Sequence, residues 1–349
     1  MRIYIYRGGE KLVGKSGVGQ AIRQQEACLR RAKIPVTDRW TADVSAVHIN
    51  TVLPDSVAAA LAARLRGRKV IWYGHSTKED FRRSFRGSDL LAPLFRRWIT
   101  FCYGLGDVVL TPTEYARDLL TGYGLKPPVY SISNGVDTTW FHPDPSLRAS
   151  FRRRYGMKEG ERCVISVGHT IARKGLPDFL ELAGRMPDVR FLWFGWTDPR
   201  LLPAGTRVAM AAAPANVRFP GFVDRERLRE AYCGADVFAF MSHEETEGIV
   251  VLEALACGIP TVVRDIPVYQ RWLRHGENIY KSSNLDGFQR NVMGLLDGSL
   301  PDLTAEGRKV AEARSLEAVG EHLREIYRRE HILPGPRASL PARRAAYGK

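Results

Sequence analysis

Residues 242–264 read SHEETEGIVVLEALACGIPTVVR. A polar loop runs through Gly248 into an apolar helix with one carboxylate, Glu253, and Glu245 lies eight positions earlier. A charge on an apolar helix is costly unless something pairs with it, and free N–H groups at a helix start attract phosphates. Glu253 falls roughly 8 Å along the helix. This spacing favours two carboxylates that hold hydroxyls on either side of a bound phosphate group; the alternative is a buried Glu neutralised by an Arg.

Strand-like and helix-like segments alternate along both halves of the chain. This alternation implies parallel sheets covered on both faces. Two such units in tandem predict an α/β protein with two Rossmann-like domains, in which ligands bind in the cleft at the carboxyl ends of the strands. Strands are expected at 2–6, 46–50, 69–75, 108–113, 129–134, 163–168, 190–195, 217–220, 236–241, 261–264 and 278–281.

The length of 349 residues suits two domains. Turn formers and prolines cluster at 134–146, which sets the boundary between an N-terminal domain, 1–140, and a C-terminal domain, 141–314. A helix over 315–331 is expected to pack back on the N-terminal domain. The remaining residues, 332–349, are rich in Pro, Gly and Arg and are expected to form a flexible basic tail.

The net charge of +14 is concentrated in the first half. Residues 1–142 hold 21 Lys and Arg against 12 Asp and Glu, which predicts an anionic partner. Nucleic acid and anionic lipid both qualify, but no nucleic-acid-binding motif accompanies the charge, so no nucleic acid is expected. No apolar run reaches the ~18 residues of a membrane span, and no signal peptide is visible. Five scattered cysteines indicate reduced core residues of a cytosolic protein.

The pattern Glu245-x7-Glu253 followed by ALACGIPTVV resembles the signature of glycosyltransferase family 4, whose members are retaining enzymes with the GT-B fold. Three further segments also resemble this family: VGHTIARKG at 167–175, SNGVDTTWFHP at 133–143 and GKSGVGQAI at 14–22. The segment GHSTKEDFRRSFRGSDLLAPLF, 74–95, resembles bacterial glycosyl-diacylglycerol synthases. The resemblance implies transfer of a hexose from a nucleotide sugar, UDP-glucose or UDP-galactose, to a lipid-linked acceptor such as glucosyl-diacylglycerol.

The same resemblance implies which residues bind the donor. Glu253 would accept hydrogen bonds from the ribose hydroxyls, and Glu245 would hold a hydroxyl of the transferred hexose. Arg173 and Lys174 would neutralise the diphosphate as it leaves; the alternative for this pair is a solvated helix start. Backbone N–H groups facing the sugar and diphosphate would come from Glu247, Gly248, Ile249 and Val250.

Two further positions are implied by resemblance, and one departs from the family. His75 would lie near the transferred sugar and bond its 6-hydroxyl; a lone His is otherwise more often structural. Gly17 would let the first loop pass close to the diphosphate. The family usually has Arg immediately after the Gly that ends the strand, whereas this chain has His169. His169 would assist the diphosphate only while it is protonated, and otherwise Arg173 acts alone.

The implied mechanism retains the anomeric configuration. No side chain is placed as a nucleophile, so a front-face displacement is expected, in which the leaving phosphate helps to deprotonate the acceptor hydroxyl and the protein contributes positioning and electrostatics. The chain has no D-x-D motif. We therefore expect no metal and no cofactor, the nucleotide sugar being a substrate.

Residues 78–98 interleave apolar side chains with arginines, which suits a helix lying in a membrane interface. Arginines near anionic lipid contribute about 1 kcal/mol each. The alternative is an ordinary amphipathic helix with solvated arginines. The basic first half and the glycolipid-synthase resemblance favour a cytoplasmic enzyme peripheral on the inner face of the cell membrane. The residues expected at the membrane or acceptor are Phe81, Arg82, Arg83, Phe85, Arg86, Phe95, Arg96, Arg97 and Trp98.

Two other activities are compatible with short patterns. Gly9-x4-Gly14-Lys15-Ser16 matches a P-loop between a strand and a helix, as in an NTPase or kinase. No strand ending in a Walker B Asp accompanies it, and the second half would be unexplained. A retaining glycoside hydrolase would need its two carboxyl groups about 5–5.5 Å apart, which the Glu245–Glu253 spacing fits poorly.

Overall fold

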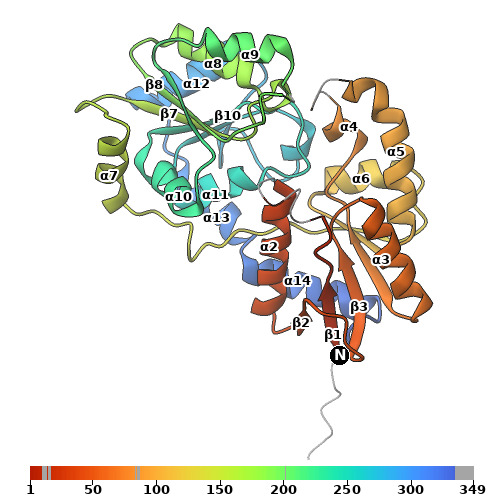
Figure 1. Ribbon diagram of the computed structural model, residues 1–349. Helices are drawn as coiled ribbons and strands as arrows, with labels where there is room; N and C mark the ends of the chain where they lie inside the picture. The colour runs from red at the N-terminus through yellow and green to blue at the C-terminus, as the bar shows by residue number, and fades with distance from the viewer. Residues whose placement is uncertain (10–13, 15–16, 83, 85–86, 201, 335–349) are drawn as a thin grey trace, which may run out of the picture.

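The computed structural model describes residues 1–9, 14, 17–82, 84, 87–200 and 202–334. It contains two six-stranded parallel sheets, each covered by helices and each forming one lobe of the molecule (Figure 1). The expected fold class, two Rossmann-like domains in the GT-B arrangement, is confirmed. In the described residues no helix combines the length and the apolar character needed to cross a bilayer.

The N-terminal sheet has the strand order β2-β1-β3-β4-β5-β6. Both faces are buried, because Val70 and Trp72 enter one core and Ile71 and Tyr73 the other, as alternation along a strand requires. Its elements are β1 (Arg2–Ile5), α2 (Gly17–Arg31), β2 (Val36–Thr37), β3 (Val44–Ile49), α3 (Pro54–Leu65), β4 (Lys69–Tyr73), α4 (Lys78–Phe81), α5 (Ser88–Gly104), β5 (Val108–Thr111), α6 (Glu114–Gly122) and β6 (Val129–Ser131).

The C-terminal sheet has the order β12-β11-β10-β7-β8-β9. The connections leave β7 in one direction and β10 in the other, so the topological switch point, where open α/β sheets bind ligands, lies between these two strands. Its elements are α7 (Ser146–Arg154), β7 (Cys163–Val167), η1 (Ala172–Lys174), α8 (Leu176–Arg185), β8 (Arg190–Phe194), α9 (Ala204–Ala211), β9 (Val217–Gly221), α10 (Arg225–Gly234), β10 (Val237–Phe240), α11 (Ile249–Cys257), β11 (Thr261–Arg264), η2 (Pro267–Tyr269), β12 (Tyr280–Ser282), α12 (Leu285–Asp297) and α13 (Thr304–Glu312).

The chain passes between the two lobes twice, and the two crossings lie side by side. The N–H of Val136 donates to the carbonyl of Arg314 at 2.9 Å, and the N–H of Leu316 donates to the carbonyl of Val136 at 3.1 Å. The last helix, α14 (Leu316–Arg329), then packs against α2 of the N-terminal lobe. Gly320 permits this packing, because a Cβ there would come within 2.4 Å of the Cys28 carbonyl oxygen.

Candidate active site

The segments after β7 and β10 meet at the switch point of the C-terminal sheet. The N–H of His243 donates to the Arg173 carbonyl at 2.8 Å. Gly175 makes this approach possible: its φ is 81°, and a Cβ would lie 2.2 Å from the Met241 carbonyl oxygen. A side chain at position 175 would therefore push η1 away from the loop that carries Glu245.

Lys174 and Glu245 form an ion pair across this junction, with side-chain exposures of 15% and 8%. Burial opposes ionisation of Glu245, but the charges of Lys174 and Arg173 and the hydrogen bond from Lys174 outweigh it and hold the pKa of Glu245 below its ordinary value. Glu245 is consequently ionised at neutral pH. The two predicted donor residues are thus brought together, with the Lys174 ammonium also 5.8 Å from the Phe240 ring centroid.

The start of α11 presents backbone donors that lack a partner in the part of the chain that the structure describes. Gly248 precedes the helix with φ 87°, and no side chain caps the helix there. A Cβ on Gly248 would lie 2.6 Å from the Tyr269 hydroxyl, so glycine is required on steric as well as conformational grounds. Among the described residues we find no hydrogen bond from the N–H groups of Gly248, Ile249 and Val250. These are the orphan donors of a first turn, which suit an anion.

Glu253 lies on the inner face of α11 and is 3% exposed. Its carboxylate accepts from the Tyr232 hydroxyl at 3.2 Å and from Gln20 Nε2, in the N-terminal lobe, at 3.4 Å. Burial raises the pKa of Glu253 to about 7, although the Tyr232 hydrogen bond opposes the rise. No ion pair to Glu253 occurs within the described ranges. The alternative raised for Glu253, neutralisation by an arginine, therefore does not occur within the described residues.

The side chain of Glu247 makes a contact in addition to the backbone role predicted for this residue, which stays a prediction. Its buried carboxylate accepts from the backbone N–H of Asn134 at 3.0 Å and from the Asn134 side-chain amide at 2.6 Å. Burial raises the pKa of Glu247, while hydrogen bonds from Ser133 and Asn134 oppose the rise. The side chain therefore joins the loop ahead of α11, residues 242–248, which we call the donor loop, to the first crossing between the lobes. No sequence pattern indicates this contact, because it spans 113 positions.

Arg173 is engaged with the N-terminal lobe. Its guanidinium pairs with Asp80 at 2.7 Å, and its Nε donates to the Ser84 hydroxyl at 3.0 Å. It also donates to the carbonyl of Glu244 at 2.7 Å. An arginine expected to grip a diphosphate is thus held by a carboxylate at the lobe interface in this structure. Contact between Arg173 and a diphosphate stays a prediction and requires an exchange of partners.

His75 follows β4 and is buried. Its Nε2 lies 3.1 Å from both Gln25 Nε2 and Asn50 Oδ1, and its ring stacks on Tyr73 with centroids 4.5 Å apart. Burial, and to a lesser extent His48, lowers the pKa of His75 to about 3, so the ring is neutral. Gln25 Oε1 and Asn50 Nδ2 are buried without a partner in the described chain. A neutral ring among unsatisfied amides fits hydrogen bonding to a hydroxyl.

His169, the departure from the family pattern, is also neutral. Its Nδ1 lies 3.0 Å from the Trp196 carbonyl, to which it donates. Burial lowers the pKa of His169, and the nearby charges of Lys174 and Arg173 lower it further. The lowered pKa disfavours the case in which a protonated His169 assists, and favours the alternative in which Arg173 acts without it. The cationic part of the site consists of Lys174 and, after exchange, Arg173.

The first loop is only partly described. Gly17 is the first residue of α2, and a Cβ there would have nothing within 4 Å. No neighbouring protein atom therefore requires glycine at position 17. The approach of this loop to a diphosphate stays a prediction. Lys15 and Ser16 of the P-loop pattern lie outside the described residues, as do Arg83, Phe85 and Arg86 of the predicted membrane segment. Among the described side chains, no group of three or more His, Cys, Asp and Glu is arranged to hold a metal ion.

The predicted membrane segment is only in part an exposed face. Phe81 stacks on Phe95 at 4.0 Å, and the Trp98 indole donates to the Val52 carbonyl at 2.7 Å. Arg82 pairs with Asp89 at 3.1 Å, and Arg96 lies over the Tyr123 ring. The exposed apolar side chains of α5 are instead Leu90, Leu91, Leu94 and Phe101, with Arg97 also exposed. None of these four apolar residues was among those expected at the membrane, because sequence alone does not tell which helix face meets the core.

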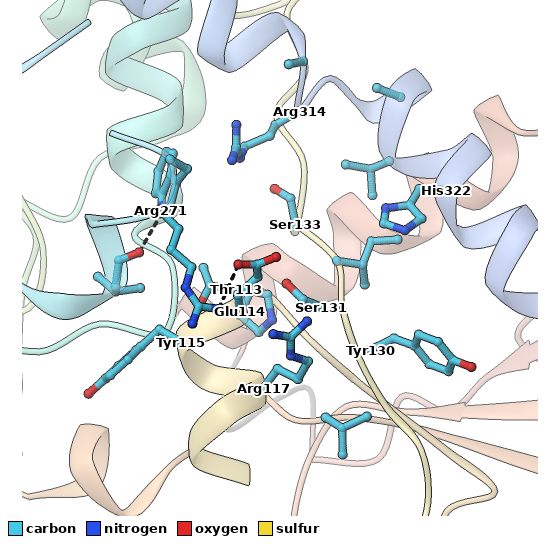
Figure 2. A pocket seen from close by; sticks show the side chains of 18 of the residues that line it. Thr113, Glu114, Tyr115, Arg117, Tyr130, Ser131, Ser133, Arg271, Arg314 and His322 are labelled. Carbon is cyan, nitrogen blue, oxygen red and sulfur yellow. Dashed lines mark hydrogen bonds and ion pairs between the residues drawn. The ribbon is translucent and has the colours of Figure 1, made fainter. Parts of the chain in front are cut away.

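A cavity of about 540 Å³ lies elsewhere between the lobes, and none of the predicted donor residues lines it (Figure 2). It is bordered by the start of α6, by β6, by the segment around η2 and by the start of α14. It is therefore a separate feature from the Lys174–Glu245 junction.

Two family models match the chain: Glycosyltransferase Family 4 at residues 23–140 and Glycosyl transferases group 1 at residues 148–311. The chain is 35% identical to the processive diacylglycerol alpha-glucosyltransferase of Acholeplasma laidlawii, over 94% of this chain and 98% of that protein. It is 28% identical to the alpha-galactosylglucosyldiacylglycerol synthase of Streptococcus pneumoniae, over 94% and 88% of the two chains.

Among solved structures, Anabaena HepE in complex with UDP and glucose superposes with a TM-score of 0.74 at 15% identity, over 93% of this chain and 99% of that one. The chain thus belongs to glycosyltransferase family 4, the GT-B glycosyltransferases that its donor-loop pattern indicated, and it is an enzyme of that class. Within the family it is similar over nearly its whole length to bacterial glycosyl-diacylglycerol synthases. Nothing in these matches supports the P-loop alternative.

Proposed function

We propose that the protein transfers a hexose from a UDP-sugar to a diacylglycerol glycolipid, with retention of configuration and without a metal ion. The observation that carries the donor part is the start of α11. There, N–H groups that have no partner in the described residues stand in the chain between Glu245, which pairs with Lys174, and the buried Glu253. An anion with hydroxyls on either side is the ligand that this arrangement suits.

In the proposed reaction the bond between the sugar C1 and the diphosphate oxygen breaks, and a bond from C1 to the acceptor hydroxyl oxygen forms on the same face. The hydroxyl proton passes to the leaving phosphate. Lys174 and the α11 N–H groups stabilise the charge that develops on the diphosphate. Glu245 and neutral His75 orient the hexose, and Glu253 accepts from the ribose hydroxyls. UDP as the nucleotide draws support from the HepE complexes with UDP and with UDP-glucose.

The acceptor and the membrane contact are proposed from α5 and from the two relatives, which are named for diacylglycerol substrates. Leu90, Leu94 and Phe101 are 86%, 65% and 51% exposed and follow one another at helical spacing, with Arg97 between them. We call these four residues the α5 stripe. Exposed apolar residues beside arginine suit a helix in the headgroup region of anionic lipid. The enzyme would thus be peripheral on the cytoplasmic face of the cell membrane.

The test incubates purified protein with UDP-glucose, UDP-galactose or GDP-mannose, with and without vesicles containing diacylglycerol or glucosyl-diacylglycerol. We expect UDP release that depends on the lipid acceptor, an α-linked product, and unchanged rates in chelator. The proposed reaction would be contradicted if neither UDP-sugar released UDP with either lipid acceptor. Activity that is lost in chelator and restored by Mg²⁺ would contradict its metal independence.

A further inference from the structure

The cavity between the lobes has the size and lining of a ligand site. Its volume of about 540 Å³ falls within the usual range of small-molecule pockets, about 300–1,000 Å³. Its apolar wall includes Ile132, Val268, Trp272 and Val319, and its basic side chains are Arg117, Arg271, Arg314 and His322. Figure 2 shows these four side chains reaching the space from separate segments. We call this space the hinge cavity, because residues of both crossings line it.

The arginines of the hinge cavity are not equivalent. Arg271 pairs with Glu114 at 2.8 Å and with Asp118 at 2.9 Å, and Arg117 pairs with Asp118 at 3.0 Å. These two guanidinium groups are therefore already neutralised by carboxylates. Arg314 differs, since no described carboxylate lies within ion-pair distance of it.

Arg314 is a partly buried cation with weak partners. Its guanidinium lies 4.6 Å from the Trp272 ring centroid, and Nη1 donates to the Val310 carbonyl at 3.4 Å. Burial lowers the pKa of Arg314, and the charge of Glu247 only partly opposes this. Arginine stays charged in proteins, and removing an unpaired charge from water is costly. A planar guanidinium at the wall of a cavity is suited to bind phosphate through two parallel hydrogen bonds.

The walls of the hinge cavity also hold the donor loop. Thr113 donates its hydroxyl to the Thr246 carbonyl at 2.8 Å, and Tyr115 donates to the Glu244 carboxylate at 2.9 Å. Ser133, another wall residue, directly precedes Asn134, which bonds Glu247. An occupant would therefore touch residues that position the loop ahead of α11, although it would bind outside the donor site.

We propose that the hinge cavity binds a phosphate-bearing ligand, with the phosphate on Arg314 and a small apolar or glycerol portion against Trp272 and Val319. The same phosphate chemistry occurs in a soluble glycerol phosphate and in the headgroup of an anionic phospholipid. The site is distinct from the proposed donor site, so its test is made with that site filled by UDP.

The experiment measures binding of glycerol 3-phosphate by titration calorimetry in saturating UDP, and recovery on phosphatidylglycerol against phosphatidylcholine vesicles by flotation. Two variants address the cavity. Arg314→Met removes the cation, and Ala318→Glu places a carboxylate at the cavity wall in the first turn of α14, where acidic residues suit the helix. Matched controls are Ala318→Gln and Arg308→Met, the latter on α13 in an exposed i,i+4 pair.

We expect saturable binding of one probe by the wild type, at least tenfold weaker in Arg314→Met and Ala318→Glu and unchanged in both controls, with the UDP affinity of folded variants preserved. If the variants lose binding of glycerol 3-phosphate alone, the ligand is a soluble phosphate. If the variants lose binding to phosphatidylglycerol vesicles alone, the ligand is a lipid headgroup. Absence of saturable binding by either probe, or equal binding by the wild type and the folded Ala318→Glu variant, would overturn the proposal. If Arg314→Met does not fold, the two Ala318 variants decide.

Discussion

The ammonium of Lys174 and the carboxylate of Glu245 form a buried ion pair that joins η1 to the loop ahead of α11. The pair keeps Glu245 ionised despite its burial. It also places one cation and one hydrogen-bond acceptor beside the free N–H groups of α11, where a sugar diphosphate needs both.

Glu245→Gln should abolish most transfer and weaken the fold. Lys174 would keep its charge in a buried position without a carboxylate, which typically costs about 3 kcal/mol, and the hexose would lose an ionised acceptor. We expect UDP release with lipid acceptor to fall at least 100-fold and the free energy of unfolding in urea to fall by about 3 kcal/mol. The matched control is Glu306→Gln, whose pair with Lys309 is exposed on α13 and should contribute less than about 1 kcal/mol. Similar losses in the two variants would contradict the account.

Glu253→Gln should change how stability depends on pH. The folded pKa is about 7, whereas an unfolded Glu titrates near about 4.3. The favourable contribution of the protonated carboxyl is therefore complete below about pH 4 and is lost as the pH rises through about 7. Gln carries no such loss. Between pH 5 and pH 8, the free energy of unfolding of the wild type should fall by about 2.5 kcal/mol relative to that of the variant. Urea titrations at the two pH values measure this, with Glu312→Gln as the exposed control; a constant difference would refute the raised pKa.

Asp80→Asn should strengthen UDP binding. Arg173 is paired with Asp80 in this structure. UDP must break this ion pair before its diphosphate can bind Arg173, and the loss of the pair weakens UDP binding. Removing the charge of Asp80 should lower the dissociation constant for UDP about three- to tenfold. This corresponds to a binding free energy more favourable by roughly 0.7–1.4 kcal/mol. Glu79→Gln, on the same helix but bonded to Tyr123, is the control and should leave UDP affinity unchanged. Weaker binding by Asp80→Asn would show that the Arg173–Asp80 pair belongs to the donor-bound state.

Leu90→Glu combined with Leu94→Glu should release the protein from vesicles without unfolding it. Both side chains are exposed, so the melting temperature should not change, whereas burying each leucine in lipid is favourable by about 1.5–3 kcal/mol. We expect at least a tenfold loss of recovery on anionic vesicles in flotation, with UDP affinity intact. Val208→Glu, at an exposed position on α9 of the other lobe, is the control. Equal recovery of the wild type and the double variant would remove the α5 stripe from the account.

The sequence was sufficient for the fold because the informative patterns are local. The strand expected at 163–168 appears as β7, Cys163–Val167, and the one expected at 261–264 as β11, Thr261–Arg264. Both are apolar runs bounded by turn formers, the pattern of strands buried on both faces. β2 was missed because two residues, Val36 and Thr37, carry no periodicity.

The partners in the site could not be read from the sequence. Asp80 for Arg173, Asn134 for Glu247 and Gln20 for Glu253 all come from the N-terminal lobe or the crossing, far along the chain. Their positions depend on how the two lobes meet, which no local periodicity encodes. The neutrality of His169 likewise follows from burial and two neighbouring cations rather than from residue type.

The most direct test of the donor site is a crystal structure of the protein with UDP-glucose. We expect the diphosphate at the N-terminus of α11 within reach of Lys174, with the ribose hydroxyls about 2.6–3.2 Å from the Glu253 carboxylate and a hexose hydroxyl at a similar distance from Glu245. A nucleotide bound elsewhere, or bound at α11 while Glu253 remains bonded to Tyr232 and Gln20 alone, would contradict this expectation.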